Sequence, residues 1–236
     1  MIEIADLHYR WPGASSDCLD IESLHLGAGR TLFLHGASGT GKSTLLGLLA
    51  GVLLPGSGRV SLMGTAWSSL PGARRDGFRA DHVGYLFQQF NLLPYLSVLD
   101  NVLLPCRFSA LRREREAAAS GTARAGAGRL LQRVGLGETL WDRPAAQLSV
   151  GQQQRVAAAR ALIGRPEVVI ADEPTSALDA SRRDAFMDLL LAQCTAGGST
   201  LVFVSHDDRL AARFDERLAL ADINRAVDPA AAGESA

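Results

Sequence analysis

The sequence predicts an α/β fold with a mostly parallel core sheet, an antiparallel β layer and an inserted helical subdomain. Three observations support this fold class. Short apolar runs typical of buried strands recur along the 236-residue chain. A glycine-rich loop joins one of these strands, residues 31–35, to an apolar helix over residues 45–50. Residues 90–150 are largely helical in pattern, which predicts an insertion into an otherwise α/β chain.

The glycine-rich loop matches the phosphate-binding pattern G-x-x-x-x-G-K-[ST] at every fixed position. A chance match in a chain of this composition has a probability on the order of one in a thousand, so an ordinary glycine turn is disfavoured. Nucleotide binding is therefore the first hypothesis. The residues predicted to bind the nucleotide here are Gly36, Ala37, Ser38, Gly39, Thr40, Gly41, Lys42, Ser43 and Thr44.

Each residue type in this loop has a physical reason. Glycines at 36, 39 and 41 allow backbone angles closed to other residues, so that successive N–H groups can curl around an anion. A helix that begins near Gly41 adds its unpaired N–H groups and its positive dipole end. Lys42, the only lysine in the sequence, supplies a point charge for the phosphates, and the Ser43 hydroxyl is placed to bind Mg²⁺.

Composition excludes several other classes of function. The net charge of −1 and the lack of a long basic run give no global attraction to nucleic acid or anionic lipid. Cys18, Cys106 and Cys194 have no metal or redox spacing, and we expect buried thiols in a reducing cytoplasm. No apolar run approaches the roughly 20 residues that span a bilayer, so any membrane part must come from another chain.

Trp11 and Gln88 lie at the ends of predicted strands and are candidate binding residues. Residues 2–11 alternate as a strand that reaches Trp11, which could stack on a nucleotide base or could simply be structural. After a short strand at 59–62 and a loop or short helix at 68–82, the strand 83–87 ends at Gln88. Ligand sites gather at the carboxyl edge of parallel sheets, so Gln88 is a candidate ligand-binding residue. The alternative is that Gln88 is an ordinary polar residue at the end of a strand.

The insertion is predicted to be helical but interrupted. Ser97 can cap a helix that runs through Leu103 and stops at Pro105. Residues 107–133 follow a helical pattern broken by glycines at 121, 126 and 128. Their arginines form either a solvated helix face, which we favour, or a surface for lipid head groups.

A helix start and a carboxylate pair follow the insertion. Ser149 caps the helix that includes residues 156–163, which creates another anion-binding helix end. The buried strand 168–171 ends in Asp172 and Glu173, and adjacent carboxylates there are costly unless they serve a cation or a proton. In this Walker B pattern, Asp172 would hold Mg²⁺ and Glu173 would align or deprotonate the attacking water.

A helix over 181–194 and a strand over 200–205 lead to His206. If these strands share one parallel sheet, Ser43, Gln88, the 172–173 pair and His206 converge on one site.

Taken together and in this order, the motifs resemble the nucleotide-binding subunit of ATP-binding-cassette (ABC) transporters, a family with a P-loop NTPase fold. The resemblance covers about residues 2–222, and residues 87–94 and 101–105 look most like the group serving lipoprotein release, macrolide export and cell division. Trp11 resembles the base-stacking aromatic, Gln88 the Q-loop glutamine and His206 the switch histidine. Residues 149–154 resemble the signature and 176–179 the D-loop.

The resemblance implies a head-to-tail homodimer that closes on two ATP molecules with Mg²⁺. Glu173, His206 and Gln88 would act in catalysis, and Ser43, Gln88 and Asp172 would bind the metal. Ser149 and Gly151 would face the γ-phosphate of the partner's ATP, and Gln152 would also bind the nucleotide. Val150 departs from the family, because the signature normally has glycine there and valine narrows the backbone angles and adds bulk.

The resemblance also implies an integral membrane permease subunit as partner and a peripheral location on the cytoplasmic face of the cell membrane. We expect one ATP-binding domain over residues 1–225, with the helical subdomain at about 90–150 and a flexible tail at 226–236. The leading function is ATP hydrolysis that powers export or lipid and lipoprotein extraction. The alternative is a regulatory clamp that transmits force to a membrane partner without moving a solute. A soluble cassette acting on nucleic acid is disfavoured, and we expect no nucleic-acid partner.

Overall fold

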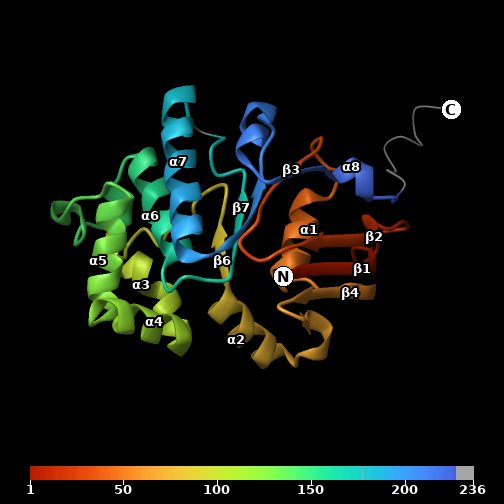
Figure 1. Ribbon diagram of the computed structural model, residues 1–236, viewed down its shortest axis with the longest axis horizontal. Coiled ribbons are helices and arrows are strands. Elements are labelled where there is room, and N and C mark those ends of the chain that lie inside the picture. The colour runs from red at the N-terminus through yellow and green to blue at the C-terminus, as the bar shows by residue number, and fades with distance from the viewer. Residues whose placement is uncertain (177, 227–236) are drawn as a thin grey trace. The chain divides into compact units, whose positions relative to one another are not determined.

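The computed structural model describes residues 1–176 and 178–226. The chain divides into two compact units. The first contains residues 1–76 and the described residues from 202 onward, and the second contains residues 77–201. Each unit has both strands and helices (Figure 1).

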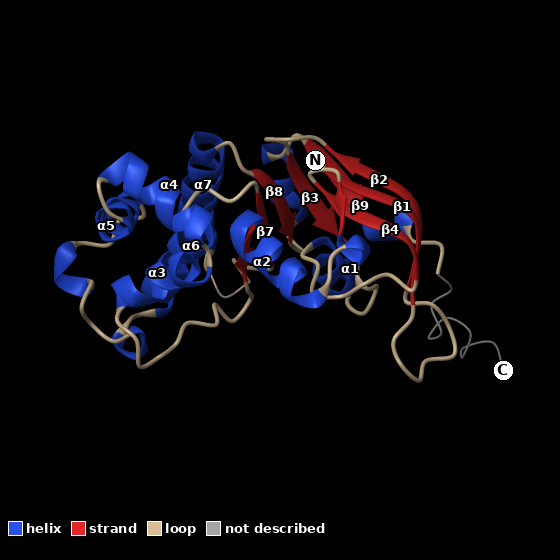
Figure 2. Ribbon diagram, turned by 90° about the horizontal axis from the view of Figure 1, so that it is seen from below, coloured by secondary structure: helices blue, strands red, loops and turns tan. Residues whose placement is uncertain are grey.

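An antiparallel sheet forms one layer of the first unit (Figure 2). Its strand order is β2-β1-β4-β5, and every neighbouring pair is antiparallel. In the centre of the sheet, Ile4 pairs with Leu24 on one side and with Val60 on the other. The strands are β1 (Ile2–Tyr9), β2 (Leu19–Leu26), β4 (Ser57–Leu62) and β5 (Thr65–Ala66). The predicted antiparallel layer is thus confirmed, with β4 beginning two residues earlier than expected.

In the same unit, the phosphate-binding loop follows one strand of a parallel pair. Strand β3 (Thr31–His35) pairs in parallel with β9 (Glu216–Ala219) and leads through the loop to α1 (Lys42–Leu49). Short helical segments complete the unit: η1 (Trp67–Ser69), η4 (Asp208–Arg213) and α8 (Leu220–Ile223).

The second unit has its own parallel pair, β6 (Val83–Leu86) and β7 (Val168–Asp172). Its helices are α3 (Val98–Phe108), α4 (Ala110–Ser120), α5 (Ala123–Arg133), α6 (Val150–Leu162) and α7 (Ala180–Gly197), with 3₁₀ turns η2 (Glu138–Leu140) and η3 (Ala145–Gln147). Helix α2 (Gly72–His82) and strand β8 (Thr200–Val204) each cross the boundary between the units. The predicted loop or short helix at 68–82 is therefore mainly an 11-residue helix.

The prediction that Pro105 ends its helix is wrong. Ser97 caps α3 as expected, and its hydroxyl accepts a hydrogen bond from the Asp100 backbone N–H. The helix then continues through Pro105 to Phe108. Proline removes one hydrogen bond within the helix, but Cys106 beyond it is 3% exposed and belongs to the apolar cluster shared by α3, α5 and α6. Tertiary packing thus outweighs the local preference.

Of the three glycines predicted to interrupt the Arg-rich segment, only Gly121 ends a helix. Gly121 follows α4 with φ +79, as predicted. Gly126 and Gly128 instead lie inside α5 and are buried. A Cβ at 128 would come within 2.6 Å of the Trp141 ring, and one at 126 within 2.1 Å of a Glu116 carboxylate oxygen. These glycines therefore allow close packing on α5 rather than breaking it.

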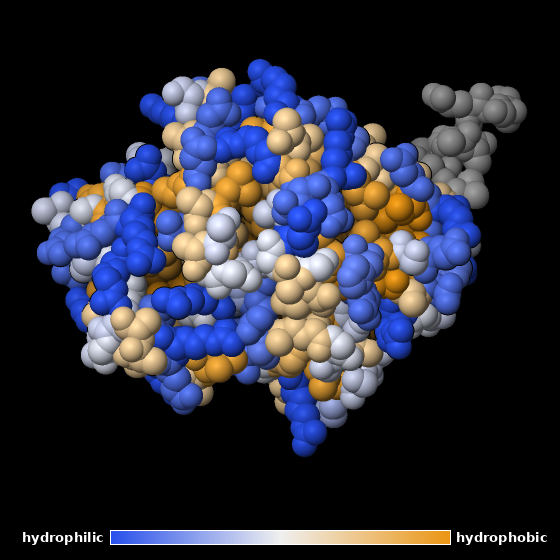
Figure 3. Space-filling view, viewed as in Figure 1, coloured by the Kyte–Doolittle hydropathy of each residue, from blue (hydrophilic) through white to orange (hydrophobic). Residues whose placement is uncertain are grey.

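The arginines of this segment divide into two groups. Arg113, Arg124, Arg129 and Arg133 are exposed, and the face over α4 and α5 is mainly hydrophilic (Figure 3). Arg112 is only 1% exposed and donates hydrogen bonds to the carbonyls of Asp81 and Ile163. Its burial lowers its pKa to about 10. The expectation of a solvated face is therefore wrong for Arg112, because its guanidinium binds backbone carbonyls near the ends of α2 and α6. It is also wrong for the half-buried Arg115, which pairs with Glu167 at 2.6 Å.

Cys106 and Cys194 are buried as predicted, whereas Cys18 is partly exposed at the end of the loop before β2. In the part of the chain that the structure describes, no helix is both long and apolar enough to cross a membrane. The predicted tail lies outside the described residues apart from Ala226.

Candidate functional site

The phosphate-binding loop has the backbone that its sequence predicts, with one difference. Gly39 and Gly41 have φ of +82 and +97, a region that favours glycine. A Cβ at Gly41 would also lie 2.9 Å from Leu19 and 3.3 Å from the Cys18 sulfur. Gly36 does not have a positive φ; a Cβ there would lie 3.1 Å from the Thr40 hydroxyl. Of the two reasons expected for a glycine here, the lack of space for a Cβ therefore holds for Gly36 and the special backbone angle does not.

Helix α1 presents its N-terminus to this loop without a side-chain cap. Gly41 is the N-cap residue and supplies no side-chain hydrogen bond. The Lys42 ammonium folds back over the loop and donates hydrogen bonds to the carbonyls of Gly36 at 2.8 Å and Ala37 at 2.6 Å. The Ser43 hydroxyl is in the first turn, and Ser43 is exposed. Unpaired N–H groups, a helix dipole and one ammonium form the chemistry of an anion site.

Trp11 borders a cavity of about 420 Å³ that also reaches Gly39 and Thr40 of the loop. Trp11 lies shortly after the end of β1 and is 46% exposed. Its ring meets Tyr9 edge to face, with centroids 5.3 Å apart. A planar base could therefore lie against Trp11 while its phosphates occupy the loop.

His206 directly follows the last buried residue of the β8 segment, Ser205. His206 is exposed. The Ser205 N–H donates a hydrogen bond to the carbonyl of Leu34 on β3, the strand that leads into the phosphate-binding loop. The structure therefore places three predicted elements in the first unit: Trp11, the loop and His206.

In the second unit, Gln88 and Asp172 lie at the same edge of the β6–β7 pair. Leu86 pairs with Ala171 in parallel register, and Gln88 and Asp172 follow these residues. Burial raises the pKa of Tyr85 on β6, and the negative charge of Asp172 raises it further. This edge therefore collects an amide and a carboxylate, as the sequence predicts.

Glu173 has an unusual backbone. Its φ is +46, in the left-handed region that non-glycine residues rarely adopt, and it precedes Pro174. Such backbone strain persists only where the surrounding structure enforces it, and it is frequent at functional sites. The main chain thus sets the direction of the Cα–Cβ bond of the residue predicted to handle the water.

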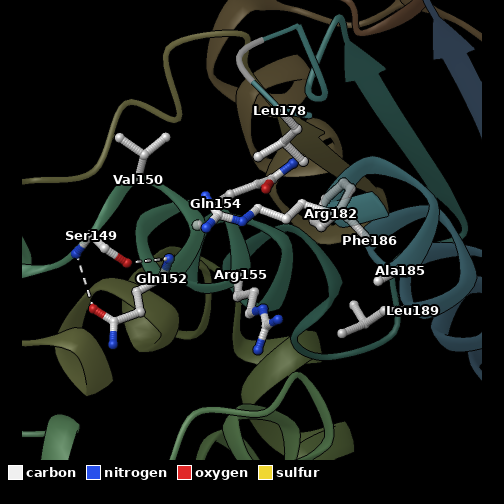
Figure 4. A pocket seen from close by; sticks show the side chains of 11 residues that line it. Ser149, Val150, Gln152, Gln154, Arg155, Leu178, Arg182, Ala185, Phe186 and Leu189 are labelled. Carbon is white, nitrogen blue, oxygen red and sulfur yellow. Dashed lines mark hydrogen bonds between the residues drawn. The ribbon is translucent and has the colours of Figure 1, made fainter. Parts of the chain in front are cut away.

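Ser149 caps α6 through a complete capping box. The Ser149 hydroxyl accepts from the Gln152 N–H at 3.3 Å, and the Gln152 side chain accepts from the Ser149 N–H at 3.0 Å. Figure 4 shows these two bonds and the Val150 side chain directed away from them. Val150 is 53% exposed. Ser149, Val150 and Gly151 border a cavity of about 500 Å³ between α6 and α7.

Two residues of α6 that the sequence did not single out connect the predicted elements of this unit. The buried Gln154 side chain donates to the carbonyl of Pro174, next to Glu173, at 2.8 Å. Arg160 donates to the carbonyls of Phe90 at 2.5 Å and Asn91 at 2.6 Å, just beyond Gln88. Phe90 and Asn91 both have positive φ, so Arg160 holds a strained turn. A polar residue on the buried face of α6 was the signal that could have revealed Gln154.

The predicted site residues thus fall into two groups, one in each unit. Trp11, the loop and His206 belong to the first unit, and Gln88, Ser149, Asp172 and Glu173 to the second. Asp179 of the predicted D-loop caps α7 by accepting from the Arg182 N–H. Ala177 of that turn lies outside the described residues.

Comparison with known proteins agrees with these motifs. A family model described as ABC transporter matches residues 19–176. YbbA of Escherichia coli (strain K12), an uncharacterized ABC transporter ATP-binding protein, is 48% identical over 192 residues, 81% of this chain and 81% of that protein. The lipoprotein-releasing system ATP-binding protein LolD of Hydrogenovibrio crunogenus is 43% identical over 204 residues, 86% of this chain and 84% of that protein.

A solved structure shares the fold. The dimeric post-hydrolysis state of the ATP-binding cassette MJ0796, bound to ADP and Pi, has a TM-score of 0.82 and 32% sequence identity. The alignment covers 97% of this chain and 98% of that one. The predicted fold class and family resemblance are thereby confirmed. The chain belongs to the ABC transporter family, in which it is an ATP-binding subunit with the ATPase cassette.

Proposed function

We propose that this chain works as a head-to-tail homodimer whose ATP-driven closure acts on a separate integral membrane permease subunit. The work done is export, or extraction of lipid or lipoprotein, at the cytoplasmic face of the membrane. The dimeric MJ0796 cassette supports the assembly, and the similarity to LolD supports the class of cargo. We further propose that residues 1–225 form the ATP-binding domain, with the helical subdomain at about 90–150.

The observation that carries the proposal is the pair of anion-binding helix ends on one chain. Helix α1 starts at the phosphate-binding loop, and α6 starts at Ser149. In the proposed dimer, the loop of one subunit binds the phosphates while Ser149, Gly151 and Gln152 of the other subunit face the γ-phosphate. Each ATP then requires both helix ends, which makes hydrolysis dependent on dimer closure.

The metal-binding residues suit Mg²⁺. Ser43, Asp172 and Gln88 offer hydroxyl, carboxylate and amide oxygens, the hard donors that this ion takes together with substrate phosphates. Mg²⁺ would neutralise charge on the phosphates. In the proposed mechanism, Lys42 and the N–H groups of the loop hold the β- and γ-phosphates. Glu173 accepts the proton of the attacking water, and His206 contacts the γ-phosphate.

The concentration dependence of ATP turnover tests the shared site. We expect the rate per subunit to rise with protein concentration and then level off, because only dimers contain complete sites. Ser149→Ala should lower the plateau at least about tenfold, since it removes a group from the partner's site. Gln147→Ala, a change just before the cap, is the control. A rate per subunit that is constant at all concentrations would contradict the shared site.

Val150 is expected to slow the cycle. Because its side chain is exposed at the first turn of α6, it adds bulk where the partner's phosphates would bind. We expect Val150→Gly to raise kcat about twofold to tenfold, corresponding to roughly 0.4–1.4 kcal/mol of barrier. Steady-state ATPase assays of the two proteins measure this ratio. Equal rates would show that the dimer accommodates valine. Val150 would then no longer indicate a slow cycle, and it would no longer favour the regulatory-clamp alternative.

A further inference from the structure

The loop that carries His206 is attached to the first unit at both ends. At its start, the Ser205 N–H donates to the Leu34 carbonyl at 3.4 Å. At its end, the Phe214 ring packs on Phe33 and Phe203, with centroids 5.5 and 5.3 Å apart. Phe33 and Leu34 belong to β3, which leads into the phosphate-binding loop. His206 therefore has a fixed attachment to this strand on either side.

A third attachment lies between these ends and consists of three charged or polar side chains. Asp208 Oδ1 is 3.3 Å from an Arg217 Nη2 and 3.6 Å from His35 Nδ1. Arg217 Nε donates a hydrogen bond to His35 Nε2 at 3.2 Å. The three side chains thus contact one another in a closed triangle. His35 immediately precedes Gly36 of the phosphate-binding loop, and Asp208 lies two residues after His206.

The hydrogen bond from Arg217 also indicates the tautomer of a neutral His35 ring. Nε2 accepts from Arg217, so it carries a lone pair and the ring proton of neutral His35 is on Nδ1. Nδ1 faces Asp208, which favours that placement of the proton. His35 is the least exposed member, with 23% of its side chain accessible against 61% for Asp208 and 51% for Arg217. The ring therefore anchors the two more exposed side chains.

We propose that His35, Arg217 and Asp208 form a positioning triad that sets the location of His206 for ATP hydrolysis. An isolated exposed ion pair contributes little, but here each of the three groups contacts the other two. Displacing Asp208 would move the 3₁₀ turn that starts at this residue and with it the nearby His206. The inference rests on the proposed role of His206 in hydrolysis.

The test measures the effect of Asp208→Asn on kcat in two proteins, the otherwise unchanged chain and the His206→Ala variant. In the otherwise unchanged chain we expect kcat for ATP to fall about threefold to tenfold, as when a reacting group is misplaced, with KM changed less than about twofold. In the His206→Ala background, measured at high enzyme concentration, the same substitution should have no further effect. This non-additivity is expected because the triad acts only through His206.

Conservative replacement and a matched control complete the design. His35→Leu should lower kcat as Asp208→Asn does, whereas His35→Gln should recover most of it, because an amide can accept from Arg217 and donate toward Asp208. Glu22→Gln, which breaks the exposed pair with Arg225, changes charge equally and should leave kcat unchanged. Melting curves establish that each variant is folded.

The outcomes distinguish failure of the triad from failure of the proposed role of His206. If Asp208→Asn matches Glu22→Gln, or lowers kcat equally with and without His206, the triad has no positioning role and the inference is overturned while the proposed function stands. If His206→Ala itself hydrolyses ATP at the full rate, the proposed role of His206 is wrong, and the inference fails with it.

Discussion

Glu173→Gln is expected to lower ATP turnover at least about 100-fold, the usual effect of removing a general base, while leaving ATP binding intact. Glutamine has the same shape but cannot accept the proton of the attacking water. Because glutamine is isosteric, we expect the backbone at residue 173 (φ +46 in the parent) to be retained, so that only the chemistry is lost. Closed dimers that cannot hydrolyse ATP should therefore accumulate.

Turnover assays, ATP-binding titrations and light scattering after size exclusion measure these three effects. Glu114→Gln is the matched control, because Glu114 is an exposed carboxylate on α4 of the same unit. It should retain parental turnover and show no ATP-trapped dimer. Unaltered hydrolysis by Glu173→Gln, or a protein that stays monomeric in saturating ATP, would count against the assigned mechanism.

Lys42→Ala should weaken ATP binding by about 10- to 100-fold, since a charge-assisted hydrogen bond to phosphate is worth roughly 1.5–3 kcal/mol. The change removes the ammonium that lies over the loop carbonyls of Gly36 and Ala37. Lys42→Arg retains the charge but not the compact geometry, and it should restore only part of the affinity. Equilibrium titration with a fluorescent ATP analogue measures these affinities. Unchanged affinity in Lys42→Ala would refute a phosphate contact by this residue.

The composition of the chain offers a direct second readout for Lys42. It is the only lysine, so an amine-reactive reagent can modify only Lys42 and the amino terminus. We expect Mg²⁺-ATP to slow modification of Lys42 and to leave that of Met1 unchanged, which makes the terminus an internal reference. Equal protection at both amines would indicate a nonspecific effect of nucleotide on the reagent.

The features that the sequence predicted correctly are those fixed by neighbours in the chain. The phosphate-binding loop depends on glycines within a few residues of Lys42, and the cap of α6 depends on Ser149 and Gln152, three residues apart. Asp172 could be placed because a continuous apolar strand precedes it. In each case the interacting groups are close in sequence, so a local pattern is sufficient.

The features that it missed depend on contacts between distant segments. Pro105 is tolerated because Cys106 packs into a cluster from three helices, and Gly128 sits inside α5 because Trp141 occupies the space of its side chain. No local pattern reveals either partner. The same reason explains why Arg160 was not predicted: its acceptors, the carbonyls of Phe90 and Asn91, are about 70 residues away in sequence.

The triad of His35, Asp208 and Arg217 shows this limit most clearly. The pairing of β3 with β9 places Arg217 opposite Phe33, from where its side chain reaches His35 at the end of β3. The turn after β8 brings Asp208 to both side chains. Each residue alone reads as an ordinary charged or polar side chain. Only the assembled strands show that they contact one another.

The most direct test of the central claim is to purify the Glu173→Gln protein from its native membranes in the presence of ATP and identify what accompanies it. We expect a stoichiometric multi-spanning membrane protein, recovered with ATP and lost when Lys42→Ala is combined with Glu173→Gln. A partner with a transport or extraction pathway would support the leading function, and one without such a pathway would favour the regulatory clamp. Recovery of the dimer alone, or with nucleic acid, would contradict the claim that this ATPase works on a membrane subunit.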